Sequence, residues 1–104
     1  MADKSREEIK QIIIETLKPL GVLRISLFGS FSRHELTETS DIDILVRLPP
    51  AKNRTLIGLR WFTLDQELQE KIGRPVDLVT EDALMDALKP IIERDLEVIY
   101  EKAG

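Results

Sequence analysis

The chain has 104 residues, enough for one domain with a single core and too few for a multi-lobed polymerase. Its 19 acidic and 15 basic residues give a net charge of -4, which provides no broad positive field for direct nucleic-acid binding. With no cysteine and one histidine, it cannot form disulfides, thiolate zinc sites or multi-histidine sites, so any metal must bind carboxylates.

The sequence pattern predicts neither a secretory signal nor a membrane-spanning segment. No stretch is apolar over the length needed to cross a bilayer, and residues 1–8 are charged where a secretory signal has an apolar core. We therefore expect one domain over residues 1–104 that is cytoplasmic and makes no membrane contact.

The first quarter of the chain predicts a helix followed by a strand. Ser5 and Glu8 form a capping pattern ahead of apolar residues at helical spacing, so a helix is expected over about 6–18. Pro19 marks its end. Apolar residues then alternate over 22–28, which is typical of a half-buried strand.

The rest of the chain predicts three further strands and two helices. An apolar strand is expected over 41–46, and a 3.6-residue period over 55–72 predicts a long helix. A short strand follows at 76–79, Thr80 caps a helix through about residue 88, and a final strand covers 96–100. This order favours an α+β fold, an α/β sandwich in which helices cover mainly one face of a small mixed sheet.

Two carboxylates occupy the start of the strand at 41–46. Asp41 and Asp43 are two residues apart, so in a strand they point to the same face, about 6.6 Å apart along the chain. A divalent cation would offset their like charges, and oxygen ligands suit Mg²⁺ or Mn²⁺. Taken alone, such a pair is more often a solvated strand start.

A third carboxylate interrupts the apolar strand at 76–79. Asp77 would cost several kcal/mol if it were buried without a partner, so a role as third metal ligand would explain it. An edge strand with a polar outward face explains Asp77 equally well when this residue is considered alone.

A Gly-Ser turn follows the strand at 22–28. Gly29 and Ser30 would present backbone N–H groups and a hydroxyl to an anion, as phosphate sites require, and Arg33 could add a charged donor. In isolation this dipeptide is more often an ordinary turn or a helix cap. Together with the three carboxylates, however, it supplies the parts that a two-metal nucleotidyl transfer needs.

These residues in this spacing resemble the minimal nucleotidyltransferase (MNT) family of the polymerase beta-type superfamily. The pattern G-S-x-A-R-G-x-x-x-x-x-S-D-I-D is matched by Gly29, Ser30, Arg33, Ser40, Asp41, Ile42 and Asp43. Ser32 stands where the family usually has Ala, and His34 stands where it usually has Gly.

The resemblance carries expectations about site, substrate and partner. It implies that Asp41, Asp43 and Asp77 are catalytic and bind Mg²⁺, with two ions expected and Mn²⁺ an alternative. It also implies that ATP binds at Gly29, Ser30, Arg33 and Ser40. Members of the family are commonly encoded beside a HEPN-type ribonuclease toxin and act as its antitoxin, some by transferring AMP to a tyrosine of that toxin.

Two other functions stay open at this level. The chain could neutralise its partner by binding alone, or it could be a nucleotide-binding regulatory module, and self-association into a homo-oligomer is allowed. Trp61 and Phe62 lie on the long helix, where we expect core packing or a partner interface rather than base stacking.

Overall fold

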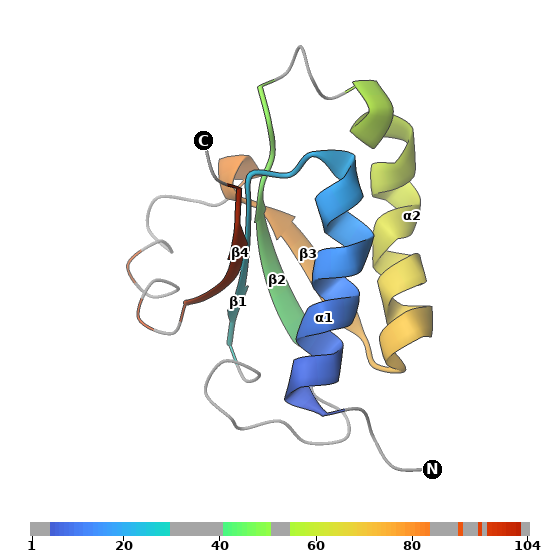
Figure 1. Cartoon of the computed structure of the whole chain (residues 1–104), viewed down its shortest axis with the longest axis vertical. Helices are drawn as coiled ribbons and strands as arrows, with labels where there is room; N and C mark the ends of the chain where they lie inside the picture. Colours follow the sequence, from blue (N-terminus) through green and yellow to red (C-terminus); the bar gives the residue numbers. More distant parts are fainter. Residues whose placement is uncertain are drawn as a thin grey trace.

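The computed structural model describes residues 5–29, 41–50, 55–83, 90, 94 and 96–102. These segments form two long helices and one four-stranded sheet (Figure 1). In chain order the elements are α1 (Arg6–Leu17), β1 (Arg24–Phe28), β2 (Ile42–Arg47), α2 (Thr55–Ile72), β3 (Val76–Thr80) and β4 (Glu97–Glu101). Short 3-10 helices occur at Lys18–Leu20 and Glu81–Ala83.

The strands lie in the order β3-β2-β1-β4. β1 runs antiparallel to both β2 and β4, whereas β2 and β3 are parallel and are connected through α2. Both long helices cover the same face of this mixed sheet, α1 and α2 lying side by side (Figure 1). The predicted α+β class, with helices on one face, is therefore confirmed.

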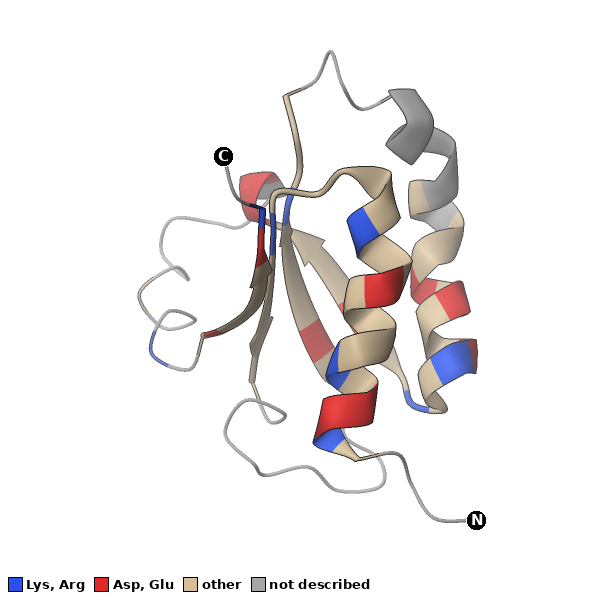
Figure 2. Cartoon of the chain, viewed as in Figure 1, with Lys and Arg blue, Asp and Glu red and all other residues tan. Residues whose placement is uncertain are grey.

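The core fills the space between the two helices and the sheet. Of the side chains whose burial is described, thirteen hydrophobic ones are at most 4% exposed, and the core cluster draws on α1, α2, β1 and β2. Its members are Ile9, Ile13, Leu17, Val22, Ile25, Leu27, Ile42, Ile44, Val46, Leu64, Leu68 and Ile72. Figure 2 shows that residues of both charge signs occur along the described parts of the two helices. Within the described segments, neither helix is both long and apolar enough to cross a membrane.

The start of α1 follows the predicted capping pattern. The backbone N–H of Glu8 donates to Ser5 Oγ at 3.1 Å, and the Ser5 hydroxyl lies 3.4 Å from a Glu8 carboxylate oxygen. These contacts satisfy an N–H that has no partner within the helix itself. At its other end the helix tightens into the 3-10 turn at Lys18–Leu20, and Gly21 closes that turn at a φ of +83°.

Several predicted boundaries differ from the observed ones; the final strand, predicted over 96–100, is observed at Glu97–Glu101. β1 begins at Arg24 rather than at residue 22, and β2 begins at Ile42, so Asp41 precedes the strand. Thr80 is the last residue of β3 and is in register with Val46. The chain then enters the 3-10 helix Glu81–Ala83, and residues 84–89 of the predicted helix lie outside the described part.

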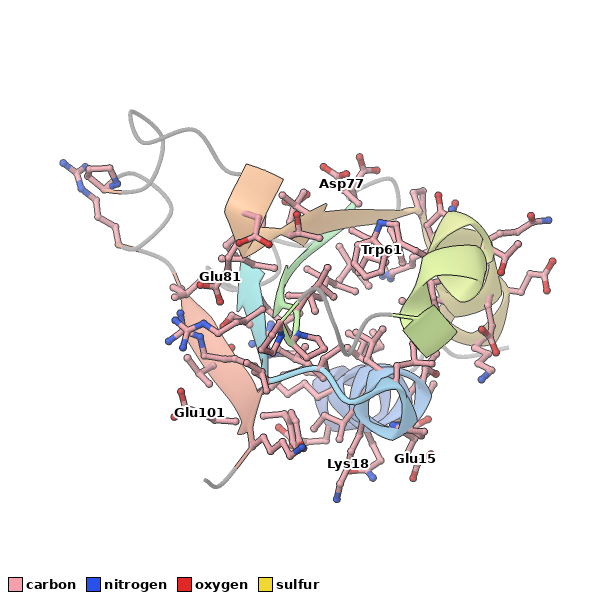
Figure 3. The ribbon with its side chains drawn as sticks, turned by 90° about the horizontal axis from the view of Figure 1, so that it is seen from above. Glu15, Lys18, Trp61, Asp77, Glu81 and Glu101 are labelled. Atoms are coloured by element: carbon pink, nitrogen blue, oxygen red, sulfur yellow. The ribbon has the colours of Figure 1, made fainter. Side chains whose placement is uncertain are left out.

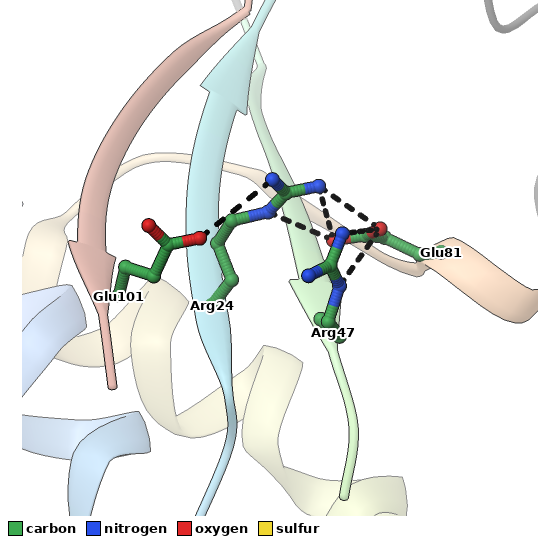
Figure 4. Close-up of polar contacts among 4 residues, drawn as sticks. All are labelled: Arg24, Arg47, Glu81 and Glu101. Carbon is green, nitrogen blue, oxygen red and sulfur yellow. Dashed lines mark hydrogen bonds and ion pairs between the residues drawn. The ribbon is translucent and has the colours of Figure 1, made fainter. Parts of the chain in front are cut away.

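Among the described residues, two sets of ion pairs connect elements that are distant in sequence. Glu97 on β4 accepts from Lys10 Nζ at 2.6 Å and from Arg6 at 3.2 Å, which ties α1 to the sheet edge. At the opposite end of the strands, Glu81 accepts from both Arg24 and Arg47 at 3.1 to 3.3 Å (Figure 4). The 3-10 helix after β3 is thereby joined to β1 and β2.

Candidate catalytic site

Two of the predicted carboxylates are neighbours across the parallel pair β2 and β3. The register places Asp43 directly beside Asp77. Adjacent strands lie about 4.8 Å apart, and in-register residues of a parallel pair point to the same face. Because Ile42 and Ile44 are fully buried toward the helices, Asp43 and Asp77 both lie on the opposite face of the sheet, here called the open face.

Asp41 lies at the end of the same open face. It is exposed and directly precedes β2. The N–H of Ile42 donates to the carbonyl of Pro75 at 3.0 Å, which extends the β2–β3 pairing to the beginning of both strands. Alternation along the extended chain then gives Asp41 the same facing as Asp43.

Although these three carboxylates share one face of the sheet, the described side chains do not surround a position for a metal ion. In the segments whose placement is known, no three His, Asp or Glu side chains gather closely enough to hold an ion. The backbone thus determines which face the carboxylates share, and side-chain rotation would have to complete any coordination.

Asp77 is exposed, which removes one argument made from the sequence. A desolvation cost cannot explain this carboxylate, since β3 is an edge strand of the described sheet and Asp77 lies on its solvent side. Figure 3 shows the side chain directed away from both helices. The two interpretations of Asp77 coexist in the structure: it is a polar residue on an edge strand, and it is the register neighbour of Asp43.

Gly29 provides space for the Asp43 carboxylate. Its φ is +73°, a left-handed conformation that favours glycine, and a Cβ built on it would overlap Asp43 Oδ2 and lie 3.3 Å from Asp43 Cγ. The preceding residue, Phe28, is the antiparallel partner of Asp43. Gly29, which directly follows β1, is therefore in direct contact with the carboxylate face of the sheet. A metal-bound nucleotide requires oxygen ligands and a close approach of the backbone, and this contact suits both requirements.

Three predicted nucleotide-binding residues cannot be placed. Ser30, Arg33 and Ser40 lie outside the described residues, as do Ser32 and His34. The predicted phosphate turn is thus represented by Gly29 alone.

A pocket of about 320 Å³ adjoins the carboxylates at the outer side of β3. It is lined by Trp61 and Asp65 of α2 and by Val76, Asp77 and Leu78 of β3. Asp65 was not among the predicted site residues. The available signal was its spacing from Trp61, because residues four apart on a helix lie on one face and can serve one site.

Comparison with known proteins identifies relatives over most of the chain. Residues 6–99 match the nucleotidyltransferase domain family. A Methanocaldococcus jannaschii protein, provisionally named a protein adenylyltransferase, is 44% identical over 82 residues, which cover 79% of this chain and 84% of the relative. The protein adenylyltransferase MntA of Thermococcus cleftensis is 35% identical, with 96% of this chain and 99% of the relative covered.

A solved structure shows the same fold. It is a crystal structure of a toxin-antitoxin with AMP-PNP, in which one chain superposes with a TM-score of 0.71 at 26% identity. The match covers 89% of this chain and 73% of that chain. The fold of this chain is thus one already observed in a solved structure, which was determined with a nucleotide analogue.

Proposed function

Because this chain belongs to the nucleotidyltransferase domain family and is a nucleotidyltransferase, we propose that it transfers AMP from ATP to a hydroxyl group of a partner protein. The names of its relatives support a protein acceptor, since both relatives described above are named protein adenylyltransferases, one of them provisionally. The observation that carries the proposal is the register of Asp43 beside Asp77, with Gly29 in contact with the Asp43 carboxylate.

The proposed partner is a HEPN-type ribonuclease toxin, and the proposed acceptor is a tyrosine hydroxyl on it. The toxin-antitoxin structure supports a toxin as partner and ATP as the donor, since that assembly contains AMP-PNP. Modification of the toxin would make this chain the antitoxin of the pair.

Asp41, Asp43 and Asp77 would bind the metal, which we propose to be Mg²⁺. These oxygen ligands fit a hard divalent cation, and phosphate oxygens of ATP would supply the ligands that the free side chains do not. Bound there, Mg²⁺ would neutralise charge on the triphosphate and favour ionisation of the acceptor hydroxyl.

The chain's own groups have separate parts in the proposed reaction. The acceptor oxygen forms a bond to the α-phosphorus of ATP, the bond from that phosphorus to the bridging oxygen breaks, and pyrophosphate leaves. Asp77 takes the hydroxyl proton as the new bond forms. Gly29 allows the backbone of the turn to approach the phosphates and leaves the Asp43 carboxylate its position.

The experiment is a transfer assay with the purified chain, its co-encoded partner and Mg-ATP. We expect the partner to gain the mass of AMP while pyrophosphate is released. Asp77→Asn should lower kcat by about 100- to 10,000-fold, the usual contribution of a positioned base, while complex formation is retained. Glu70→Gln, at an exposed position of α2, is the matched control and should keep full activity.

The same experiment separates transfer from neutralisation by binding alone. If the partner stays unmodified yet is inhibited equally by the wild type and by Asp77→Asn, the chain works as a binding-only antitoxin. That result would contradict the proposed reaction.

A further inference from the structure

The outer edge of β3 presents backbone groups with no strand beside them in the described sheet. β3 is the last strand in the order β3-β2-β1-β4. The Pro75 carbonyl accepts from Ile42 on β2, and backbone groups alternate in direction along a strand. The N–H and C=O groups of Val76 and Leu78 therefore point outward, whereas those of Asp77 point to β2. Such an edge can pair with another extended segment.

The apolar side of this edge is incompletely covered. Val76 and Leu78 are only partly buried, although their register partners Ile42 and Ile44 are 0% exposed. Trp61 is likewise partly buried, and Figure 3 places it on the helix side of β3, across the strand from Asp77. The pocket of about 320 Å³ occupies this place. Its volume is at the small end for ligand sites, which suits one side chain better than a whole nucleotide.

The pocket walls indicate the kind of side chain that fits. Trp61, Val76 and Leu78 are apolar, whereas Asp65 and Asp77 contribute exposed carboxylates. Asp65 Oδ1 already accepts the backbone N–H of Gln66 at 2.8 Å. An ionised carboxylate has two oxygens, so it can accept further hydrogen bonds from a ligand. The site therefore fits an apolar or aromatic anchor that has a hydrogen-bond donor at its end.

The position of this edge relative to Gly29 favours the acceptor over the nucleotide. Gly29 follows β1, and β2 with Asp43 lies between β1 and β3. In an in-line transfer the attacking oxygen and the leaving pyrophosphate lie on opposite sides of the phosphorus. With the leaving group on the side of Gly29, the attacking hydroxyl comes from the side of β3.

We propose that the acceptor segment of the partner protein binds as an added strand on the outer edge of β3. This inference rests on the proposed function. Adjacent side chains of a strand point to opposite faces, so one side chain would enter the pocket at Trp61 while its neighbour in sequence lies on the open face beside Asp77. The modified hydroxyl is then carried by the residue next to the anchor. Trp61 and Asp65 are the residues that determine acceptor specificity.

Steady-state kinetics test the pocket. Trp61→Ala should raise the KM for the acceptor protein about tenfold, the effect of removing a buried aromatic anchor contact, with the KM for ATP changed less than twofold. Trp61→Phe should restore most of the loss. Asp65→Asn should raise the acceptor KM less than Trp61→Ala does. Gln66→Ala on α2 and Val98→Ala on the opposite edge strand are matched controls that should leave both KM values unchanged.

Amide hydrogen exchange tests the added strand without depending on turnover. In the complex with the partner, exchange at Val76 and Leu78 should slow at least about tenfold, because their N–H groups become hydrogen bonded. Exchange at Asp77 and Val79 should change little, since these N–H groups are already directed to β2. Trp61 is the chain's one tryptophan, so its fluorescence should also change on binding.

The outcomes distinguish this inference from the proposed function. If the wild type modifies the partner but Val76 and Leu78 are not protected, the edge-strand mode is wrong while the transferase activity stands. A rise in the KM for ATP in Trp61→Ala, with an unchanged acceptor KM, would assign the pocket to the nucleotide and overturn the inference. Absence of transfer by the wild type would contradict the proposed function itself, and this inference with it.

Discussion

Gly29 and the Asp43 carboxylate are in contact so close that no Cβ fits between them. The glycine follows β1, and the aspartate is on β2 in register with the last residue of β1, Phe28. This contact joins the turn expected to bind phosphate to the carboxylate expected to bind metal. It also makes the two parts of the site sensitive to a single methyl group.

Gly29→Ala should abolish Mg-ATP binding and transfer. The added methyl group would displace the Asp43 carboxylate, and the left-handed backbone would add a cost of about 1–2 kcal/mol. Gly73→Ala is the matched control, because Gly73 has a φ of +82° and, apart from its chain neighbours, no atom of the described residues lies within 4 Å of a built Cβ. Calorimetry with Mg-ATP and thermal melts of both variants measure the difference. We expect the two variants to lose similar stability, and only Gly29→Ala to lose Mg-ATP binding. Intact Mg-ATP binding in Gly29→Ala would contradict the role of this contact.

The double variant Asp41→Asn and Asp43→Asn should bind Mg-ATP much more weakly than the wild type. Two anionic oxygen ligands become neutral amides, whereas the shape of the site changes little. Isothermal titration with Mg-ATP and with ATP in excess EDTA gives the metal-dependent part of the affinity. An unchanged affinity in the double variant would remove these two residues from the metal site.

Glu81→Gln should lower the free energy of unfolding by about 1–3 kcal/mol, because two guanidinium groups lose a shared charged acceptor. Arg24 and Glu81 are each 22% exposed in this pair, so solvent screens it only in part (Figure 4). Glu101→Gln is the control: Glu101 is 61% exposed and 3.9 Å from Arg24, and its loss should change stability by less than about 0.5 kcal/mol. Urea unfolding measures the free energy of unfolding of both variants. Equal losses would show that the Glu81 ion pairs stabilise the fold no more than the Glu101 pair does.

Ser26→Ala should leave stability unchanged or raise it by about 1 kcal/mol. Ser26 on β1 is 0% exposed, and its hydroxyl has no hydrogen-bond partner within the described structure. Burying a hydroxyl without a partner costs free energy that an alanine does not incur. Denaturant unfolding measures the change, with Ser5→Ala as a contrast, because that substitution removes a helix cap and should destabilise by about 1 kcal/mol. A clear loss of stability in Ser26→Ala would mean that the hydroxyl has a structural role.

Local patterns predicted the elements well where each depends on its own residues. The cap at Ser5 and the apolar spacing after it predicted α1, and the 3.6-residue period predicted α2 over the observed Thr55–Ile72. The observed start of β2 differs from the predicted start by one residue. The alternation of Asp41, Ile42 and Asp43 predicts a strand from residue 41, whereas Ile42 is the first residue that pairs with β3.

The candidate site could be predicted only in part. Asp41, Asp43 and Asp77 stand out in the sequence because each lies in or directly beside an apolar strand, and their roles in metal binding stay a prediction. Trp61 was expected in core packing or at a partner interface, while Asp65 carried no signal apart from its helical spacing. The pocket exists only because α2 packs beside the edge of β3, which no single segment indicates.

The sequence by itself determined which segments become helices and strands and that three carboxylates lie on or next to strands, since those properties follow from the periodicity of neighbouring residues. Only the tertiary structure decided that Asp43 lies beside Asp77, that Gly29 contacts Asp43, and that β3 has an open edge next to Trp61. Strand order and register depend on how β1 and β2 bury one apolar face against α1 and α2 together. Contacts between segments far apart in the chain determine this order and register, so the pattern of neighbouring residues does not reveal them.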